Sequence, residues 1–437
     1  MGLFGKKKAN KKGGSSALFD ELTGVLSLGE FCREAEDFIV NNQGASFAVC
    51  RVSVGNIGAI NEAYGMMSGD KILKKAAQVL TSDNEGKAIV ARDRSKFVFM
   101  VPYSSQEEVD AWIKSLHDKL GDVGSVLEQN PKVYMHMGVY MTANRLVDKT
   151  VEEMIACAKI AESDASKRTH ASVVYYSEQL KVLAQEDEIL VRDMKKALEK
   201  KEFLVSLQPR FDAEENVVGA KLMTRWIHPQ IGSVGAWRFI PLFVKNGFIL
   251  DLDLYLLEQA CALIKRWADA GKKPLSLSVN MPRILVSNER NLKKCVDLKK
   301  KYAVDDKLLE LEFSERLIED SINIMPSVFE YFRKKGFSLA IENFGAGSAL
   351  DDTITSFRPD TIKFSRDLFE KGYCTDDEMQ LLDRCIKTAK DTGVATAVTG
   401  VPESVIPMLK EKGIDIIQGN INETPLSIAE FENRYIK

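Results

Sequence analysis

Apolar segments that read as strands alternate with long amphipathic segments over the second half of the chain, and this alternation restricts its fold more than any other feature. Eight candidate strands fall between residues 203 and 417. They are Phe203 to Leu207, Val217 to Met223, Leu275 to Val279, Leu308 to Phe313, Ser338 to Ile341, Asp360 to Ile362, Val394 to Val398 and Ile414 to Ile417. This pattern is typical of an α/β architecture and predicts a (β/α)8 barrel.

Polar residues stand at or just after the end of every candidate strand. They are Gln208, Arg225, Asn280, Glu312, Glu342 with Asn343, Lys363, Thr399 and Gln418. One such residue is usually a loop residue that hydrogen-bonds the backbone, but a whole rim of them indicates a site, because the loops at this end of a barrel surround its open face. Arginine and lysine suit phosphate or carboxylate, whereas carboxylate and amide oxygens suit hard cations. We expect the rim to bind an anionic ligand.

The first half of the chain divides into three parts. Residues 1–16 hold five lysines and no acidic residue, and we expect a disordered basic tail, for which attraction to an anionic membrane is the alternative reading. Short strands and helices over 17–177 predict an α+β domain with helices on an antiparallel sheet. Apolar residues at helical spacing over 178–200 predict a connecting helix that packs against a domain or a second chain.

Composition excludes several classes of function. The 60 basic and 63 acidic residues give a net charge of -3, so we expect no duplex nucleic acid as a partner. No apolar run approaches the roughly 18 residues of a membrane helix, and the first residues lack a signal-peptide core, so we expect no transmembrane segment and a cytoplasmic protein. The seven cysteines contain no C-x-x-C pair, which indicates neither a zinc site nor a disulfide framework.

Motifs in the barrel region resemble those of the EAL domain, the barrel that binds and hydrolyses cyclic di-GMP. They are LQPR (207–210), VGAKLMTRW (218–226), RFIPLF (238–243), LDLYLLEQAC (252–261), SVNM (278–281), LELEFSE (309–315), AIENFGAGS (340–348), DTIKF (360–364) and IIQGNINETP (416–425). Their order and spacing agree with the family, so the resemblance implies an EAL-type TIM-like barrel over 186–437.

Motifs in the first half are similar to those of the GGDEF domain, the diguanylate cyclase module, which has a nucleotidyl-cyclase-like fold. They are DELTGVLSLGEF (20–31), INEAYGMMSGDKIL (60–73) and ARDRSKFVFMVP (91–102). The resemblance implies a GGDEF–EAL tandem of bacterial second-messenger signalling.

The first domain departs from its family where the chemistry lies. The signature loop reads DRSKF over 93–97, without both glycines and the acidic pair, and Ser53 stands at the position of a metal-binding aspartate. Two magnesium ions on a triphosphate need carboxylate ligands, so we expect no cyclase activity. The product-inhibition motif is replaced by NEGK over 84–87. Asn61 and Asp70 match the guanine-recognising positions, which leaves GTP binding or purely structural roles open.

The barrel also departs from its family. The EAL triplet has become KLM over 221–223, the paired acids after the fifth strand are Glu342 and Asn343, and two further acidic positions hold Ser365 and Thr399. Asn280, Glu312, Lys363 and Gln418 match the family. We expect Lys221 to repel a cation and to pair with Glu312.

These departures predict that no remnant catalytic position is functional, that no metal is held and that no cofactor is required. Magnesium would be needed only for residual phosphodiesterase activity, with Asn280, Glu312 and Glu342 as its candidate ligands.

Ligand binding is a separate question, because it does not require metals. Gln208, Arg225, Asp253 and Pro425 match positions that line the family's ligand groove, and Lys221 and Lys363 add positive charge. The leading hypothesis is a catalytically inactive protein that acts as a cyclic di-GMP receptor or regulatory adaptor with a signalling partner protein. The alternatives are a nucleotide-independent interaction scaffold and a weak residual cyclic di-GMP phosphodiesterase. A homodimer is compatible with each of these hypotheses.

Overall fold

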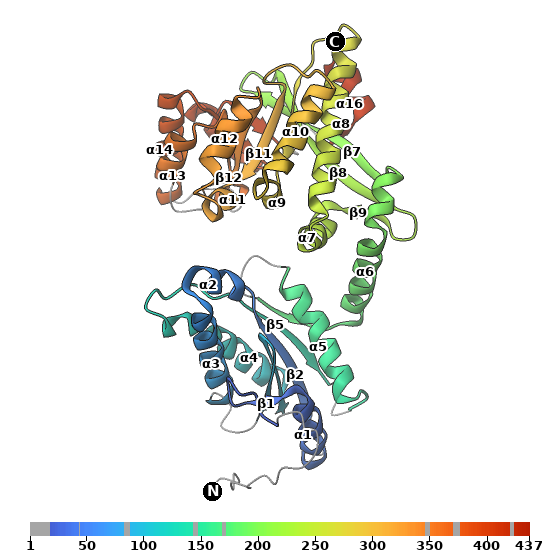
Figure 1. Ribbon diagram of the computed structural model, residues 1–437, viewed down its shortest axis with the longest axis vertical. Coiled ribbons are helices and arrows are strands. Elements are labelled where there is room, and N and C mark those ends of the chain that lie inside the picture. The colour runs from blue at the N-terminus through green and yellow to red at the C-terminus, as the bar shows by residue number, and fades with distance from the viewer. Residues whose placement is uncertain are drawn as a thin grey trace. The chain divides into compact units, whose positions relative to one another are not determined.

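The computed structural model describes residues 18–42, 44–82, 88–142, 147–167, 172–345, 350–369, 376–419 and 424–437. The chain divides into two compact units between Glu188 and Ile189. Figure 1 shows the elements of each unit, and each is described by itself below.

The first unit is built on one mixed sheet. Its strands are β1 (Leu26–Ser27), β2 (Ser46–Val54), β3 (Ile89–Asp93), β4 (Lys96–Tyr103), β5 (Met135–Met141) and β6 (Ser172–Tyr175). The sheet has six strands in the order β1-β3-β4-β2-β5-β6. β2 pairs antiparallel with both β4 and β5, whereas β1 and β6 pair in parallel at the two edges. Every residue of β2 is buried, as expected for a central strand covered on both faces.

Helices cover the two faces of this sheet. They are α1 (Leu28–Asn41), α2 (Ile57–Tyr64), α3 (Met66–Ser82), α4 (Gln106–Gly121), the 3-10 turn η1 (Val123–Val126) and α5 (Val151–Ala165). Hydroxyl and acidic residues mark their beginnings: the Thr150 hydroxyl accepts a hydrogen bond from the backbone N–H of Glu153, whose side chain accepts from Thr150 in return. α2 and α3 are separate helices because Gly65, with φ of 86°, ends α2.

The second unit is a closed barrel. Its strands are β7 (Phe203–Asp212), β8 (Val217–His228), β9 (Gly232–Gly235), β10 (Ser276–Asn280), β11 (Leu309–Ser314), β12 (Ser338–Phe344), β13 (Thr361–Phe364), β14 (Ala395–Thr399), β15 (Ile416–Gln418) and β16 (Leu426–Ser427). They form a ten-stranded sheet in the order β16-β7-β15-β14-β13-β12-β11-β10-β8-β9, and a further pairing of β7 with β8 closes it.

The first strand of this barrel runs against its neighbours, unlike in an all-parallel (β/α)8 barrel. β7 pairs antiparallel with both β8 and β15, and β8 and β10 to β15 pair in parallel around the rest of the barrel. Only residues 213–216 separate β7 from β8. A connection this short makes a hairpin, because a parallel crossover needs about a dozen residues or more.

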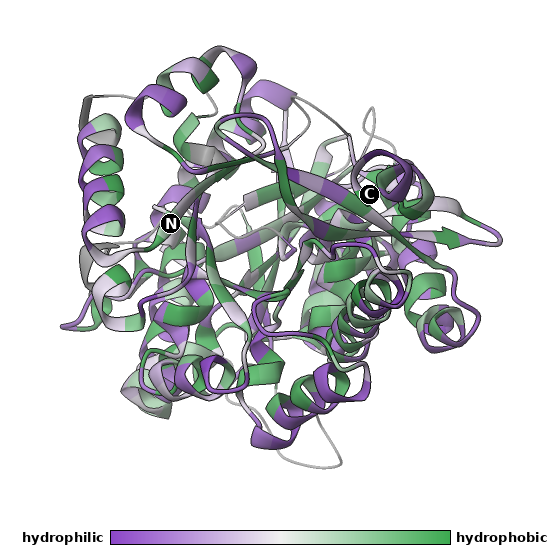
Figure 2. Ribbon diagram, turned by 90° about the horizontal axis from the view of Figure 1, so that it is seen from above, coloured by the Kyte–Doolittle hydropathy of each residue, from purple (hydrophilic) through white to green (hydrophobic). Residues whose placement is uncertain are grey.

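Helices surround the barrel. They are α7 (Ala236–Asn246), α8 (Ile249–Asp269), α9 (Arg283–Val286), α10 (Glu289–Lys301), α11 (Glu315–Asp320), α12 (Met325–Arg333), α13 (Leu350–Phe357), α14 (Asp376–Thr392), α15 (Ile406–Lys412) and α16 (Ile428–Tyr435), with the 3-10 turns η2 (Arg366–Phe369) and η3 (Glu403–Val405). Figure 2, coloured by hydropathy, shows that polar and apolar residues alternate along the helices of the molecule. Their apolar faces pack on the strands in one continuous core that includes Leu277, Leu311 and Phe332.

A continuous helix, α6 (Glu178–Glu199), crosses the division between the units, as the periodicity over 178–200 predicted. Its first half packs Leu180 against a small cluster of the first unit, and Asp187 accepts a bond of 2.6 Å from Lys167. Its second half buries Leu190 fully against the aromatic cluster of α7 and β8. Within the described part of the chain, no helix is both long and apolar enough to span a membrane.

Candidate functional site

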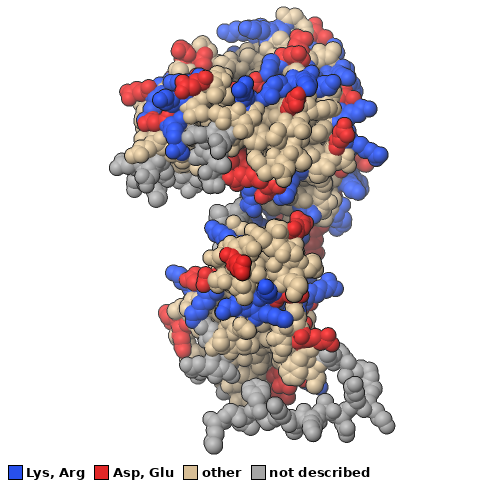
Figure 3. Space-filling view, turned by 60° about the vertical axis from the view of Figure 1, so that its left-hand side comes forward, with Lys and Arg blue, Asp and Glu red and all other residues tan. Residues whose placement is uncertain are grey.

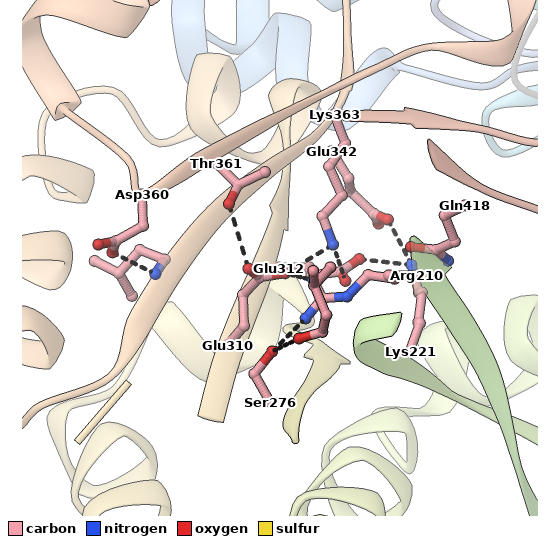
Figure 4. A network of polar contacts seen from close by, with 12 residues as sticks. Arg210, Lys221, Ser276, Glu310, Glu312, Glu342, Asp360, Thr361, Lys363 and Gln418 are labelled. Carbon is pink, nitrogen blue, oxygen red and sulfur yellow. Dashed lines mark hydrogen bonds and ion pairs between the residues drawn. The ribbon is translucent and has the colours of Figure 1, made fainter. Parts of the chain in front are cut away.

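A chain of alternating charges fills the barrel at the level where Lys221 lies. Lys221 Nζ is 2.7 Å from Glu312 Oε2 and 2.8 Å from Glu342 Oε2. Lys363 contacts Glu312 on its other side and lies 2.8 Å from Glu310 Oε1. Figure 4 shows these side chains converging from β8, β11, β12 and β13. Three of the predicted rim residues, Glu312, Glu342 and Lys363, therefore meet Lys221 in one ion network.

The network holds its charges by mutual compensation. Burial alone would lower the pKa of Lys221, but Coulomb attraction to Glu312 and then to Glu342 outweighs it, and the pKa is raised. Burial alone would raise the pKa of Glu312, but Lys221 and Lys363 hold it well below its ordinary value of 4.5. Lys221 is thus a charged ammonium and Glu312 a charged carboxylate at neutral pH.

This arrangement does not fit the two magnesium ions of an EAL-type hydrolase. Cations of this kind need anionic oxygens that are free to coordinate them. Here Lys221 Nζ already bonds to Glu312 and Glu342, the two carboxylates that the sequence offers as ligands. Among the residues that the structure describes, no group of three or more His, Cys, Asp or Glu side chains is placed to hold a metal ion.

Two further rim residues, Gln208 of the antiparallel strand β7 and Gln418 of β15, contact each other. Gln418 donates from Nε2 to Gln208 Oε1 at 3.0 Å, and its own Oε1 is buried without a hydrogen-bond partner. Gln208 lies inside β7 rather than at its end, and its register partner on β8 is Lys221. The remaining rim positions are Asn280, exposed and in register with Glu312, and Thr399, in register with Gln418.

The other residues predicted to bind ligand are Arg225, Asp253 and Pro425. Arg225 lies within β8, exposed, and donates to Ser233 Oγ at 3.0 Å. Asp253 of α8 is buried, which raises its pKa well above the ordinary value of 3.8, and the charge of Glu342 raises it further. Pro425 is exposed immediately before β16, whose Leu426 pairs with Leu207 of β7.

One part of the ion network, the pair of Arg210 with Glu310, was not predicted from the sequence. Arg210 Nη1 lies 2.5 Å from Glu310 Oε1, and Arg210 Nη2 donates to Ser276 Oγ at 2.9 Å. The signal was present, because side chains two residues apart on a strand share a face. Arg210 follows Gln208 by two positions, and Glu310 precedes Glu312 by two.

The signature loop of the first unit forms an ion network of its own. Asp93 and Lys96 flank a two-residue turn between β3 and β4, in which Arg94 has φ of 59°. Lys96 Nζ lies 2.8 Å from Glu162 Oε2, and the Ser53 hydroxyl donates to Glu162 Oε1 at 2.5 Å. The position of the family's metal-binding aspartate is thus tied to a buried glutamate of α5.

The candidate guanine-binding residues lie on α2 and α3. Asn61 lies against α3, where a Cβ on Gly69 would come within 2.1 Å of its Oδ1. Asp70 is exposed on the surface of α3. Residues 84–87, the position expected for the product-inhibition motif, lie outside the described part of the chain, as do residues 346–348 of AIENFGAGS.

Charges of both signs are mixed on the face seen in Figure 3, where Lys and Arg side chains are interspersed with Asp and Glu side chains. Exposed ion pairs such as Lys301 with Glu258, at 2.6 Å, bring opposite charges together. With a net charge of -3, the chain carries little excess charge of either sign.

Comparisons with known families agree with this fold. The family model of the EAL domain matches residues 191–425. The family model described as the diguanylate cyclase GGDEF domain matches residues 17–171.

Two curated relatives come from Pseudomonas aeruginosa. The bifunctional diguanylate cyclase/cyclic di-GMP phosphodiesterase MucR is 20% identical over 383 residues, covering 87% of this chain and 56% of the relative. The cyclic di-GMP phosphodiesterase NbdA is 24% identical over 424 residues, covering 95% of this chain and 54% of the relative. The chain therefore spans about half the length of these relatives.

Solved structures share the fold at low identity. The S helix-GGDEF-EAL region of Vibrio cholerae LapD, bound to c-di-GMP, matches with a TM-score of 0.67 at 15% identity, covering 93% of this chain and 96% of that one. The PaMucR phosphodiesterase in complex with c-di-GMP matches with a TM-score of 0.53 at 20% identity, covering 55% of this chain and 99% of that one.

Proposed function

We propose, from the premise that this chain belongs to the EAL domain family and carries a GGDEF domain ahead of its barrel, that it is a catalytically inactive receptor for cyclic di-GMP. The observation that carries the proposal is the position of Lys221. Its ammonium group bonds to Glu312 at 2.7 Å and to Glu342 at 2.8 Å, where a hydrolase would need free carboxylates. Phosphodiester hydrolysis through metal-bound water is therefore not expected.

Binding draws on groups that the ion network leaves available. Lys221 has three N–H donors, of which the two carboxylates take two, so one remains for a ligand oxygen. Gln418 Oε1 is a buried acceptor without a partner, and a buried acceptor gains free energy when a ligand N–H reaches it. Two structural neighbours, MucR and LapD, are described as bound to c-di-GMP, which supports this class of ligand for the shared fold.

A receptor also needs a path from its ligand to the rest of the chain. β8 carries Lys221 and Arg225, and its last residue, His228, lies 3.2 Å from Asp193 of α6. His228 Nδ1 accepts from the backbone N–H groups of Gln230 and Ile231, so its Nε2 donates to Asp193. Ligand at β8 would bias the packing of the connecting helix, and through it the surface offered to a signalling partner protein, to the extent that it binds one state better.

The inactive state is tested by a turnover assay on the full chain. Cyclic di-GMP would be incubated with high protein concentration and magnesium, and linear pGpG would be measured by chromatography, with MucR as the active control. We expect no product. Magnesium-dependent formation of pGpG would overturn the inactive assignment and favour the residual phosphodiesterase.

A further inference from the structure

The face of β8 that holds Lys221 continues past the ion network as an exposed surface. Side chains two apart on a strand share a face, so Lys221, Met223, Arg225 and Ile227 point the same way. Arg225 follows Lys221 by four residues, about 13 Å along the strand. Ile227 is 41% exposed, and Leu204, the cross-strand partner of Arg225 on β7, is 55% exposed. The surface beyond the network is thus apolar with one guanidinium.

Trp237 lies on this same surface. On the other side of β8, Arg225 pairs with Gly235 of β9, so the two share a face. A Cβ built on Gly235 would meet the indole of Trp237, with Nε1 at 2.7 Å and Cδ1 at 2.8 Å. The indole therefore rests over Gly235, beside Arg225, and remains 79% exposed. Gly235 has an ordinary extended backbone, with φ of -74°, so its missing side chain makes room for the ring.

From this geometry, and resting on the proposed function, we infer that Trp237 is a stacking platform for one guanine base of cyclic di-GMP, beside Arg225, which the sequence resemblance already assigns to the ligand groove. An exposed indole offers a flat π-face of the kind on which nucleobases stack, and a guanidinium beside it recognises phosphate. Exposing the largest apolar side chain on this surface is otherwise unfavourable, because it leaves its area in water. The platform adds affinity that does not depend on metal ions.

The test uses the full chain, cyclic di-GMP as the probe, and both calorimetry and tryptophan fluorescence in EDTA. The chain has four tryptophans, of which Trp226 and Trp267 are buried, so quenching by a stacked base reports mainly on Trp237. We expect Trp237→Ala to raise the Kd by about ten- to a hundredfold. Trp237→Phe should retain most of the affinity while losing the quenching. Trp112→Phe, in the first domain, should keep both.

A second variant tests the position of the ring rather than its presence. Gly235→Ala keeps Trp237 and suits the backbone, but its methyl group must displace the indole, so we expect it to weaken binding as Trp237→Ala does. Thermal melts would confirm that both variants fold. Unchanged affinity in Trp237→Ala and Gly235→Ala, with binding by the parent chain intact, would overturn the platform and leave the receptor proposal standing. Absence of binding by the parent chain would overturn both.

Discussion

Lys221 Nζ lies 2.7 Å from Glu312 Oε2 and shares that carboxylate with Lys363, which contacts the other oxygen. The side-chain exposures of Lys221 and Glu312 are 13% and 0%, so water screens the pair little. Lys221, a residue of β8, brings to these carboxylates the positive charge that metal ions would otherwise supply. The proposed loss of hydrolysis and the proposed metal-independent binding both rest on this contact.

Removing the ammonium should destabilise the barrel. Lys221→Met would leave Glu312 and Glu342 with fewer cationic partners, and breaking a buried pair costs about 3–5 kcal/mol of unfolding free energy. Chemical denaturation at pH 7 would measure this. Arg283→Met, which breaks an exposed pair with Asp320 at 3.0 Å, is the matched control and should cost less than about 1 kcal/mol. Equal losses in the two variants would contradict the role given to Lys221.

The cost of Lys221→Met should depend on pH. The pKa of Glu312 is depressed in the folded state, so its ion pairs stabilise the fold above its unfolded pKa, near 4.5, and this stabilisation is lost as the pH falls through the folded pKa. The difference between the parent chain and the variant should therefore be largest near neutrality and shrink below about pH 4. Denaturation midpoints at several pH values would check this, and a difference that grows on acidification would refute it.

Reversing the charge should restore a response to magnesium. Lys221→Glu gathers three carboxylates where one ammonium and two carboxylates stood, and such clusters repel each other until a cation binds. We expect weaker cyclic di-GMP binding in EDTA, recovery in magnesium, and a melting temperature that rises with magnesium only in this variant. Lys221→Gln, which removes the charge without adding one, is the control. If magnesium changed neither the affinity nor the melting temperature of Lys221→Glu, this would contradict the proposal that Lys221 replaces a metal cation.

The contribution of Asp253 to stability should depend on pH in the opposite sense to that of Glu312. Burial raises the pKa of Asp253 well above 3.8, so the folded state keeps the proton to a higher pH than the unfolded state does, and stability falls as the pH rises above the unfolded pKa. Asp253→Asn removes this term and should make the variant more stable than the parent chain at pH 7, with a smaller gain near pH 4. Thermal unfolding at the two pH values would show it, and a variant that is less stable at pH 7 would argue against the buried neutral acid.

The first domain should depend on Glu162 for stability rather than for chemistry. Glu162 accepts from Ser53, lies 2.8 Å from Lys96 Nζ and lies 3.7 Å from Nε of the buried Arg51, so Glu162→Ala leaves buried donors without this acceptor and should cost about 1–3 kcal/mol. Glu162→Gln removes the charge but keeps one acceptor oxygen, and should cost less. Calorimetry should show that Glu162→Gln binds cyclic di-GMP with the affinity of the parent chain. A loss of affinity would instead mean that the first domain takes part in binding.

Much of this site was predictable because its residues stand at strand ends. The alternation of strands and helices predicted the barrel, and the rim positions of Glu312 and Lys363 predicted that their side chains would lie close together. The pairing of Lys221 with Glu312 was predicted from the place of Lys221 in the EAL-like motif together with Coulomb attraction. Periodicity therefore predicted the rim, and the resemblance added Lys221 to it.

The remainder depends on tertiary register. The reversed direction of β7 was hidden because the four residues before β8 were not weighed as a hairpin, and β9 was missed because a short glycine-bounded segment has no clear periodicity. The place of Trp237 beside Arg225 depends on the pairing of β8 with β9, which no local pattern specifies. Arg210 was not predicted because it does not stand at the end of a candidate strand.

Calorimetric titration of the full chain with cyclic di-GMP, first in EDTA and then in magnesium, would show whether the barrel is a metal-independent receptor. We expect saturable binding in EDTA with a Kd that magnesium leaves unchanged, because Lys221 already holds the carboxylates that a metal would need. No heat in either buffer would contradict a receptor role and favour a nucleotide-independent scaffold, and binding that appears only with magnesium would contradict the surrogate cation.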